Sequence, residues 1–292
     1  MPPDVAELAA VYRAWFTTAA RRRAEQVVEL DDLCPGAFAV LDPQFPLSYD
    51  SNRVVLPTVP DGLELADVLV AVEETLAGLD HRELSGYDAV PPEWDQAMAA
   101  RGVSVQRVLG MVRPLVDLDG ADAVPPAVDG VEVEQLTEAQ VAPFVAAQWR
   151  EDEPSFDDET VRQLVERRVR KTRAGQVHLL AVRIPDDAVA LDPALAAAAG
   201  GLAAQLDLVV GGTEVEGRAQ TVAELDAVST LSHWRRRRYG DALVAAALRT
   251  AADAGARAVV LEALVEDWPR EWYARRGFVE VSGSTGYSWR PL

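Results

Sequence analysis

The sequence is poor in the residues that form covalent or metal cross-links. Cys34 is the single cysteine among 292 residues, so neither an intrachain disulfide nor a cysteine-based zinc site can form. The three histidines, at positions 81, 178 and 233, are scattered along the chain, and we expect no metal cofactor. Such sparse use of cysteine fits a reducing compartment, so the expected location is cytoplasmic.

Positive charge is also scarce. The chain has 28 basic and 47 acidic residues, and its net charge of −19 favours a cationic small molecule over nucleic acid or an anionic membrane as partner. Residues 1–4 lack the basic and apolar regions of a signal peptide, and the alanine-rich stretch 193–210 is interrupted by Gly200, Gly201 and Asp207. Neither secretion nor membrane insertion is therefore indicated, and the oligomeric state stays unknown.

Length and composition predict a folded chain with one large or two moderate domains, since 49% of the residues are hydrophobic and 26% are charged. Residues 117–130 combine Pro, Gly and Asp without apolar periodicity, which is typical of an exposed linker. We therefore expect an N-terminal domain over 1–117, a linker over 118–130 and a C-terminal domain over 131–292.

The C-terminal half alternates strand and helix patterns. Strands are expected at 131–136, 176–184, 201–210, 219–230 and 258–265, and helices at 138–152, 157–174 and 241–254. The pair Gly211-Gly212 predicts the turn of a hairpin between two of these strands, and 185–193 is expected to be a surface loop. This succession favours a mixed α/β fold around a central sheet.

The N-terminal half has a similar pattern, with helices expected at 5–25, 65–77 and 92–101 and strands at 38–42, 53–58, 82–87 and 104–113. Residues 99–114 resemble residues 274–291, and Gly78 ends a helix before a strand as Gly255 does. We infer a diverged internal duplication.

The segment from Leu231 to Leu243 indicates an anion-binding site. A strand leads into the basic turn Arg235–Arg238, and a helix follows. The unpaired N–H groups and the positive dipole end of a helix attract anions, and the arginines add formal charge, so a diphosphate would fit here. A solvated arginine run that merely precedes a helix is the alternative.

Five pieces in this order resemble the GCN5-related N-acetyltransferase (GNAT) superfamily, over about 131–292. They are the strand Ala223–Thr230, the loop Arg235–Ala242, the helix stop Gly255, the buried strand Val259–Val265, and Trp272–Phe278 with a tyrosine ahead of a Gly-Phe pair. The resemblance implies the acyl-CoA N-acyltransferase fold in the C-terminal half. It also implies acetyl-CoA as co-substrate and direct acetyl transfer to an amine, without a covalent enzyme intermediate.

The family's pyrophosphate loop, (Gln/Arg)-x-x-Gly-x-(Gly/Ala), fits this chain in two registers. If Gly240 is the second glycine of the motif, Arg238 occupies the first glycine position, where an arginine would neither tolerate an unusual φ nor let the backbone approach phosphate. The other register begins at Arg237. The resemblance assigns coenzyme binding to Val228, Thr230, Arg235, Arg236, Arg237, Arg238, Tyr239, Gly240, Asp241 and Ala242.

The resemblance places Tyr273 at the usual position of the general acid, which protonates the departing thiolate, with aromatic packing as the alternative. Glu224 lies where some members hold the general base, and strand alternation places Asp226 on the same face, so either carboxylate could serve. Trp268, Trp272, Trp289, His233 and Trp234 are expected to pack, and the basic run 167–173 is expected to be a solvated helix face.

The N-terminal half lacks the loop, and Met98 aligns with Tyr273, so this half resembles the degenerate lobe of a tandem GNAT protein. We expect it to complete the acceptor cleft, with Tyr49, Asp50 and Asn52 within reach, or to support the fold. The sequence thus predicts an acetyl-CoA-dependent N-acetyltransferase for a small cationic amine. The alternative is a non-catalytic acyl-CoA-binding or sensing protein; nucleic-acid binding through the arginines conflicts with the charge.

Overall fold

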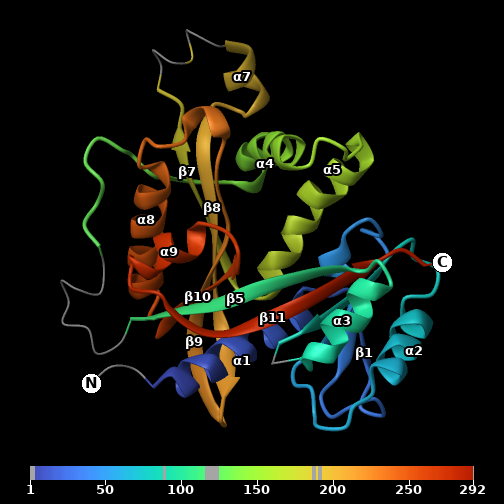
Figure 1. The fold of residues 1–292 in the computed structure, drawn as a ribbon. Helices are drawn as coiled ribbons and strands as arrows, with labels where there is room; N and C mark the ends of the chain where they lie inside the picture. The colour runs from blue at the N-terminus through green and yellow to red at the C-terminus, as the bar shows by residue number, and fades with distance from the viewer. Residues whose placement is uncertain (1–3, 88–89, 116–124, 186–188, 190–192, 292) are drawn as a thin grey trace. The chain divides into compact units, whose positions relative to one another are not determined.

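A computed structural model describes residues 4–87, 90–115, 125–185, 189 and 193–291. The chain divides into two compact units (Figure 1). Unit 1 comprises Met1–Arg113, Glu214–Gly217 and Leu261–Leu292, and unit 2 comprises Pro114–Thr213 and Arg218–Val260. The expected linker lies partly at 116–124, outside the described residues.

Unit 1 is built on a mixed sheet with the order β1-β2-β3-β4-β11-β5. Its strands are β1 (Gln26–Glu29), β2 (Phe38–Leu41), β3 (Arg53–Leu56), β4 (Arg82–Gly86), β5 (Ser104–Pro114) and β11 (Val279–Trp289). Its helices are α1 (Val5–Arg23), α2 (Leu65–Thr75), α3 (Pro92–Ala100) and α9 (Pro269–Ala274), with the 3-10 turn η1 (Tyr49–Ser51). β3 and β4 are parallel, and β11 runs antiparallel to both β4 and β5.

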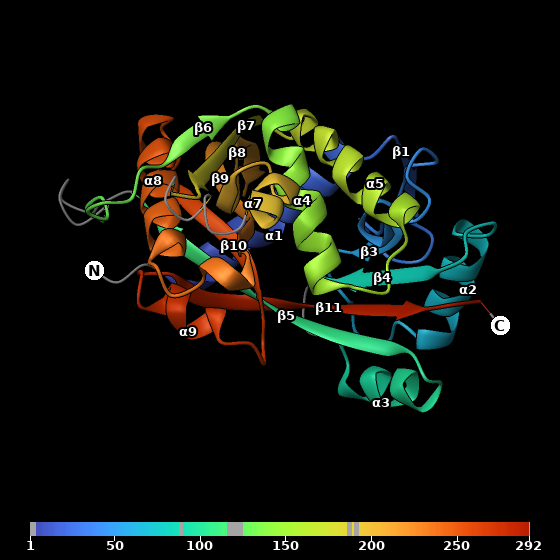
Figure 2. The same cartoon turned by 90° about the horizontal axis from the view of Figure 1, so that it is seen from above.

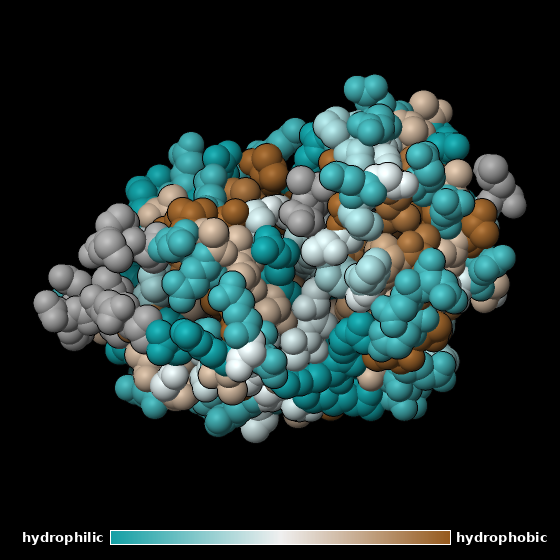
Figure 3. Space-filling view, turned by 90° about the horizontal axis from the view of Figure 1, so that it is seen from below, coloured by the Kyte–Doolittle hydropathy of each residue, from teal (hydrophilic) through white to brown (hydrophobic). Residues whose placement is uncertain are grey.

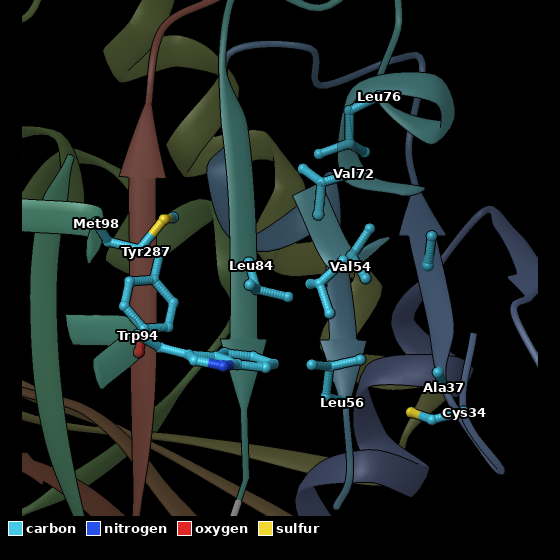
Figure 4. Close-up of a cluster of buried hydrophobic side chains, with 12 residues drawn as sticks. Cys34, Ala37, Val54, Leu56, Val72, Leu76, Leu84, Trp94, Met98 and Tyr287 are labelled. Carbon is cyan, nitrogen blue, oxygen red and sulfur yellow. The ribbon is translucent and has the colours of Figure 1, made fainter. Parts of the chain in front are cut away.

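One hydrophobic core cluster of unit 1 lies between this sheet and the helices α2 and α3, while α1 buries Tyr12 and Trp15. Figure 4 shows Val72 of α2 and its C-cap Leu76 directed toward β3, while Trp94 and Met98 of α3 lie beside Tyr287 of β11. All of these side chains are buried. Apolar residues at helical spacing in α2 and α3 therefore supply the cover that the apolar face of the sheet requires.

Unit 2 has the strand order β10-β9-β8-β7-β6. The strands are β6 (Glu134–Leu136), β7 (Gln176–Arg183), β8 (Leu202–Val215), β9 (Arg218–Thr230) and β10 (Ala258–Leu264). The helices are α4 (Glu138–Asp152), α5 (Asp158–Glu166), α7 (Pro193–Ala198) and α8 (Tyr239–Asp253), with 3-10 turns η2 (Arg167–Arg173) and η3 (Ser232–Trp234). Helix α8 packs on β7 and β9, whereas α4 contacts β7, α5 and α7 (Figure 2).

Two local expectations for the C-terminal half are wrong. The glycines 211 and 212 stay within β8, and the hairpin turn lies at Glu216 and Gly217, whose φ angles of +51° and +75° suit a tight two-residue turn. The helix expected over 157–174 ends at Glu166 and continues as the 3-10 turn η2. The expected loop at 185–193 lies mostly outside the described residues, and the short strand β1 was not anticipated.

Each unit contains a parallel β-α-β crossover, β3-α2-β4 in unit 1 and β9-α8-β10 in unit 2. The glycines aligned by the proposed duplication also share a conformation. Gly78 and Gly255 have φ angles of +92° and +75°, and Gly102 and Gly277 have +74° and +81°. Helices often end on glycine in this left-handed region, and the duplication stays a prediction.

The compact units differ from the expected domains, because residues 261–292 belong to unit 1. The physical reason is the pairing of β11, which forms backbone hydrogen bonds with β4 and β5 along most of its length. The expected mixed α/β fold is confirmed.

Among the described residues, no helix has the length and apolarity to cross a membrane. On the face that Figure 3 shows, hydrophilic residues (teal) lie between the hydrophobic patches (brown).

Candidate active site

The site begins on the part of β9 that extends beyond the residues paired with β10. The parallel pairs join Val222, Ala223 and Glu224 to residues 258–260, and β9 then continues to Thr230. Ala227 has a φ of +51°, so a bulge-like distortion interrupts this second half. The residues change from buried at Glu224 to half-buried from Asp226 onward, and Val228 and Thr230 are among the half-buried ones.

The basic loop after β9 has an unusual backbone. Arg236 and Arg238 have φ angles of +63° and +64°, which cost an L-residue about 1–2 kcal/mol each. Arg238 is the N-cap of α8, and its carbonyl accepts the first helical bond, from the Ala242 N–H at 3.1 Å. The expectation that an arginine could not adopt such a φ at position 238 is wrong.

This backbone distinguishes the two motif registers. Glycine tolerates a positive φ, and of the two candidate glycine positions, 238 and 240, Arg238 is the one with this conformation. Gly240 lies within α8 and is absent from the positive-φ residues. The geometry therefore favours Arg235-x-x-Arg238-x-Gly240, with arginine replacing glycine.

Contacts within unit 2 hold the loop. The Arg235 Nε donates to the Thr230 carbonyl at 3.1 Å, and its guanidinium lies 3.4 Å from Glu151. Glu151 also accepts from the Ser232 N–H at 2.9 Å. Arg235 to Arg238 are all exposed, and the Arg238 Nε lies 3.4 Å from an Asp241 carboxylate oxygen in the first turn of α8. The loop thus presents exposed cationic groups beside a helix N-terminus, an arrangement suited to a diphosphate.

The residues next to the basic loop differ in their burial. Tyr239 and Ala242 are buried under the loop, while Gly240 and Asp241 are half-buried. Trp234 is buried as expected, with the Arg237 guanidinium 5.1 Å from its ring centroid. His233 is exposed, and its ring packs edge-on against Trp234 with centroids 4.9 Å apart, so the expected packing is confirmed.

The two candidate carboxylates on β9 have different surroundings. Glu224 is 3% exposed, whereas the Asp226 side chain is 36% exposed and its Oδ2 lies 2.7 Å from the Lys171 Nζ. Lys171 and Arg168 both pair with the fully buried Asp207. The expectation of a solvated basic face is therefore wrong for Arg168 and Lys171, because η2 turns both side chains toward β8 and β9.

Tyr273 belongs to an aromatic group in unit 1. It is 7% exposed on α9, with ring centroids 5.6 Å from Phe278 and 4.8 Å from Trp272. Trp268 is 68% exposed and its ring lies edge-on to Trp272 with centroids 6.1 Å apart, which fits packing at the rim of this group. Trp289 packs against the core of unit 1 as expected. The surroundings of Tyr273 are compatible with both packing and proton donation.

The turn with Tyr49, Asp50 and Asn52, which was expected to reach the acceptor, is held together by the side chain of Asn52. Asn52 is 1% exposed; its side chain accepts from the Asp42 N–H and donates to the carbonyls of Phe45 and Ser48. A role for Asn52 in contacting an acceptor is therefore wrong. Tyr49 and Asp50 are exposed, and the ring of Tyr49 stacks on His81.

Unit 1 also holds a buried polar cluster that the sequence did not reveal. Burial raises the pKa of Glu83 on β4 to about 7, and the hydroxyl of Ser288 donates to its carboxylate. The Arg53 guanidinium lies 3.2 Å from the Tyr87 hydroxyl and 3.6 Å from Asp50. A carboxyl that is protonated near neutral pH makes the stability of this cluster dependent on pH.

The ion pairs of Asp207 were also missed, although a signal was present. Asp207 is a charged residue within the largely apolar stretch 202–210, and a charge in such a place requires a buried counter-ion. Across the described residues, no group of three or more His, Cys, Asp or Glu side chains could hold a metal ion.

Comparisons with known proteins agree with this geometry. Residues 147–278 match the model of the acetyltransferase (GNAT) family. No protein of curated function matches the sequence significantly. Because the similar solved structures share less than 25% identity with this chain, they establish the fold alone.

Several of these structures cover most of the chain, and three of them illustrate the similarity. A GCN5-related N-acetyltransferase from Kribbella flavida is 18% identical, with a TM-score of 0.57 over 98% of this chain and 96% of that one. A conserved protein of unknown function from Staphylococcus epidermidis is 16% identical, with a TM-score of 0.62 over 88% and 91%. A tandem GNAT protein from the clavulanic acid pathway is 17% identical, with a TM-score of 0.50 over 83% and 75%. The chain therefore shares the fold of these structures over nearly its whole length, and its residues 147–278 match the model of the acetyltransferase (GNAT) family.

Proposed function

We propose that this protein is an acetyl-CoA-dependent N-acetyltransferase that transfers the acetyl group directly to the amine of a small, cationic substrate. The observation that carries the proposal is the left-handed Arg238 at the N-cap of α8, in the basic loop that follows β9 and η3, where β9 extends beyond its residues paired with β10. This arrangement supports diphosphate binding within the region that matches the GNAT family model.

The residues present fit the coenzyme. The exposed guanidinium groups of Arg235 to Arg238 complement a diphosphate, and the amides of Tyr239 and Gly240 precede the first helical bond of α8. The half-buried backbone at Val228 and Thr230 is suited to hydrogen bonding with pantetheine. When bound, acetyl-CoA supplies the thioester that acylates the amine.

Two protons must move during the reaction. A protonated amine has to lose a proton before it can attack, and we assign its removal to the Glu224 carboxylate, directly or through water. The phenol of Tyr273 would give its proton to the departing sulfur. In the N-terminal lobe, residues 1–117, the aligned position is Met98, which is fully buried in the core and has no proton to give. This lobe is accordingly proposed to be catalytically silent.

The first test is calorimetric titration of the purified protein with acetyl-CoA, free CoA and adenosine diphosphate. The proposal predicts micromolar binding of the first two ligands. Absence of binding would remove the enzyme proposal. Coenzyme binding without transfer to any member of an amine panel would favour the non-catalytic acyl-CoA-binding or sensing protein instead.

The second test uses Tyr273→Phe and Glu224→Gln. Each variant should lower kcat by about 100-fold or more while the affinity for acetyl-CoA stays within a factor of about three. Glu271→Gln is the matched control for the glutamate, since its side chain is 85% exposed on α9. A Tyr273→Phe enzyme with full turnover would remove the phenol from the mechanism.

A further inference from the structure

A cavity of about 630 Å³ lies at the start of α2 in unit 1. It is formed by the loop that leads from β3 into α2 and by the residues that lead into α3. Its walls come from residues 59–65, 90–94 and 97. Small-molecule sites occupy about 300–1,000 Å³, so this cavity is large enough for one small organic molecule.

The cavity occupies the same place in the topology of unit 1 as the basic loop does in unit 2. In the crossover β3-α2-β4 it lies at the connection from strand to helix, and in β9-α8-β10 that connection carries Arg235 to Arg238. The charge is opposite, because residues 57–65 contain Asp61 and Glu64 and neither arginine nor lysine. Like charges repel, so this cavity disfavours the diphosphate that the basic loop suits and favours a cation.

Three carboxylates at the cavity have no cationic partner among the described residues. They belong to Asp61, Glu64 and Glu93, which are all exposed. Glu93 lies in the first turn of α3, where an acidic residue stabilises the helix dipole. Asp61 lies outside both helices, and Glu64 is the N-cap of α2 but makes no side-chain capping bond within the described part of the chain. Both of these carboxylates are therefore available to a cation.

Much of the remaining lining is apolar. Val59, Leu63, Leu65 and Val90 are half-buried, and Trp94 is only 4% exposed. No described residue accepts a hydrogen bond from the indole N–H of Trp94, although a buried indole usually has such a partner. A ligand with an apolar body would cover these side chains, and an oxygen atom on that body would accept the indole proton.

We propose that this cavity binds an organic cation with an apolar body, with its charged nitrogen at Asp61 and Glu64 and its apolar part against Trp94. Exposed ion pairs are weak, so burial of the apolar part supplies most of the affinity and the carboxylates select the positive charge. The site uses none of the residues assigned to acetyl transfer, and this inference therefore does not rest on the proposed function.

The probe is 4-methoxyphenethylamine, which carries an ammonium group at neutral pH, an aromatic ring and an ether oxygen. Calorimetry measures its binding to the full-length protein beside two comparison compounds. These are the neutral 4-methoxyphenethyl alcohol and 1,4-diaminobutane, a cation without a ring. The probe should bind at least about fivefold more tightly than either, since it alone combines the charge with the apolar body.

The charges are tested by the double variant Asp61→Asn/Glu64→Gln. It should weaken binding of the probe about fivefold and leave the affinity for the alcohol unchanged, because it removes only the two ionic contacts. The matched control is Asp32→Asn/Glu74→Gln, an equal change of charge at two exposed residues outside the cavity. Both control residues should leave the affinity for the probe unchanged.

The location is tested by Ala97→Leu, which narrows the cavity from α3 without changing its charge. This variant should weaken binding of the probe about tenfold or more, because the ring loses part of its burial. Ala100→Leu, at the exposed last residue of α3, is the matched control. Glu224→Gln should bind the probe as the wild type does.

A wild-type protein that binds the probe no more tightly than the alcohol would overturn the proposal, as would equal effects of the double variant and its control. If Ala97→Leu bound the probe as tightly as Ala100→Leu, the cavity would not be the site. Loss of binding in Glu224→Gln would assign the probe to the acetyl-transfer site instead. Failure of the wild type to bind acetyl-CoA, with cavity-dependent binding of the probe intact, would count against the acetyltransferase alone.

Discussion

The substitution Arg238→Gly tests whether the loop before α8 stores backbone strain. The φ of +64° at Arg238 costs about 1–2 kcal/mol, and glycine adopts it without that cost. Replacing the residue loses an exposed ion pair with Asp241 worth at most about 0.5 kcal/mol. It also adds about 0.4–1 kcal/mol of chain entropy to the unfolded state. Removing a cation from a helix N-terminus returns about 0.3 kcal/mol.

The net expectation is that Arg238→Gly leaves the free energy of unfolding unchanged or raises it by up to about 1 kcal/mol. Arg237→Gly is the matched control, because it removes the same charge at a position without a positive φ. The control also loses the contact between Arg237 and Trp234, so it should lower the free energy of unfolding by about 1 kcal/mol.

Urea unfolding followed by circular dichroism measures both variants, and the difference between them should be about 1–2 kcal/mol in favour of Arg238→Gly. The comparison cancels the change in net charge. If Arg238→Gly proved as destabilising as Arg237→Gly, the strain argument would be refuted. The argument for the motif register beginning at Arg235 would then lose its support.

Three further substitutions test local features. Burial raises the pKa of Glu83 from 4.5 to about 7, so the folded state holds a proton that the unfolded state releases. Stability should therefore fall by up to about 3 kcal/mol from pH 4.5 to above pH 7, and Glu83→Gln should lose this part of the dependence in urea unfolding; identical pH slopes would contradict it. Gly175→Ala places a Cβ 2.2 Å from the Val210 carbonyl oxygen and should cost at least about 2 kcal/mol, whereas Gly212→Ala, with 3.9 Å to its nearest atom, should cost far less; similar thermal midpoints would refute the close approach. Asn52→Ala removes three buried hydrogen bonds and should cost about 2–4 kcal/mol, so an unchanged unfolding midpoint would show that the turn does not depend on them.

Features that depend on neighbours along the chain were predictable from the sequence. The bounds of α4 agree with the expected helix at 138–152, and α8 follows the basic turn and ends just before Gly255. Helix periodicity, caps and stops are local, so composition and spacing indicate them. The succession of motif pieces likewise predicted the mixed α/β fold and the match of residues 147–278 to the GNAT family model.

The tertiary structure decided what depends on distant partners. The sequence around Val279 to Trp289 does not indicate that β11 pairs with β4, about 200 residues earlier, and so joins unit 1. The basic run at 167–173 looked solvated, because only the fold brings Lys171 to Asp207 and Asp226.

Arg238 illustrates the same division within a few residues. The sequence showed an arginine in a glycine position, and the structure showed that the arginine takes the conformation of glycine. Local propensity disfavours that φ, but helix α8, anchored on β7 and β9, outweighs a cost of about 1–2 kcal/mol. Preferences of single residues are readable from sequence, whereas their outcome depends on packing free energies summed over residues far apart in the chain.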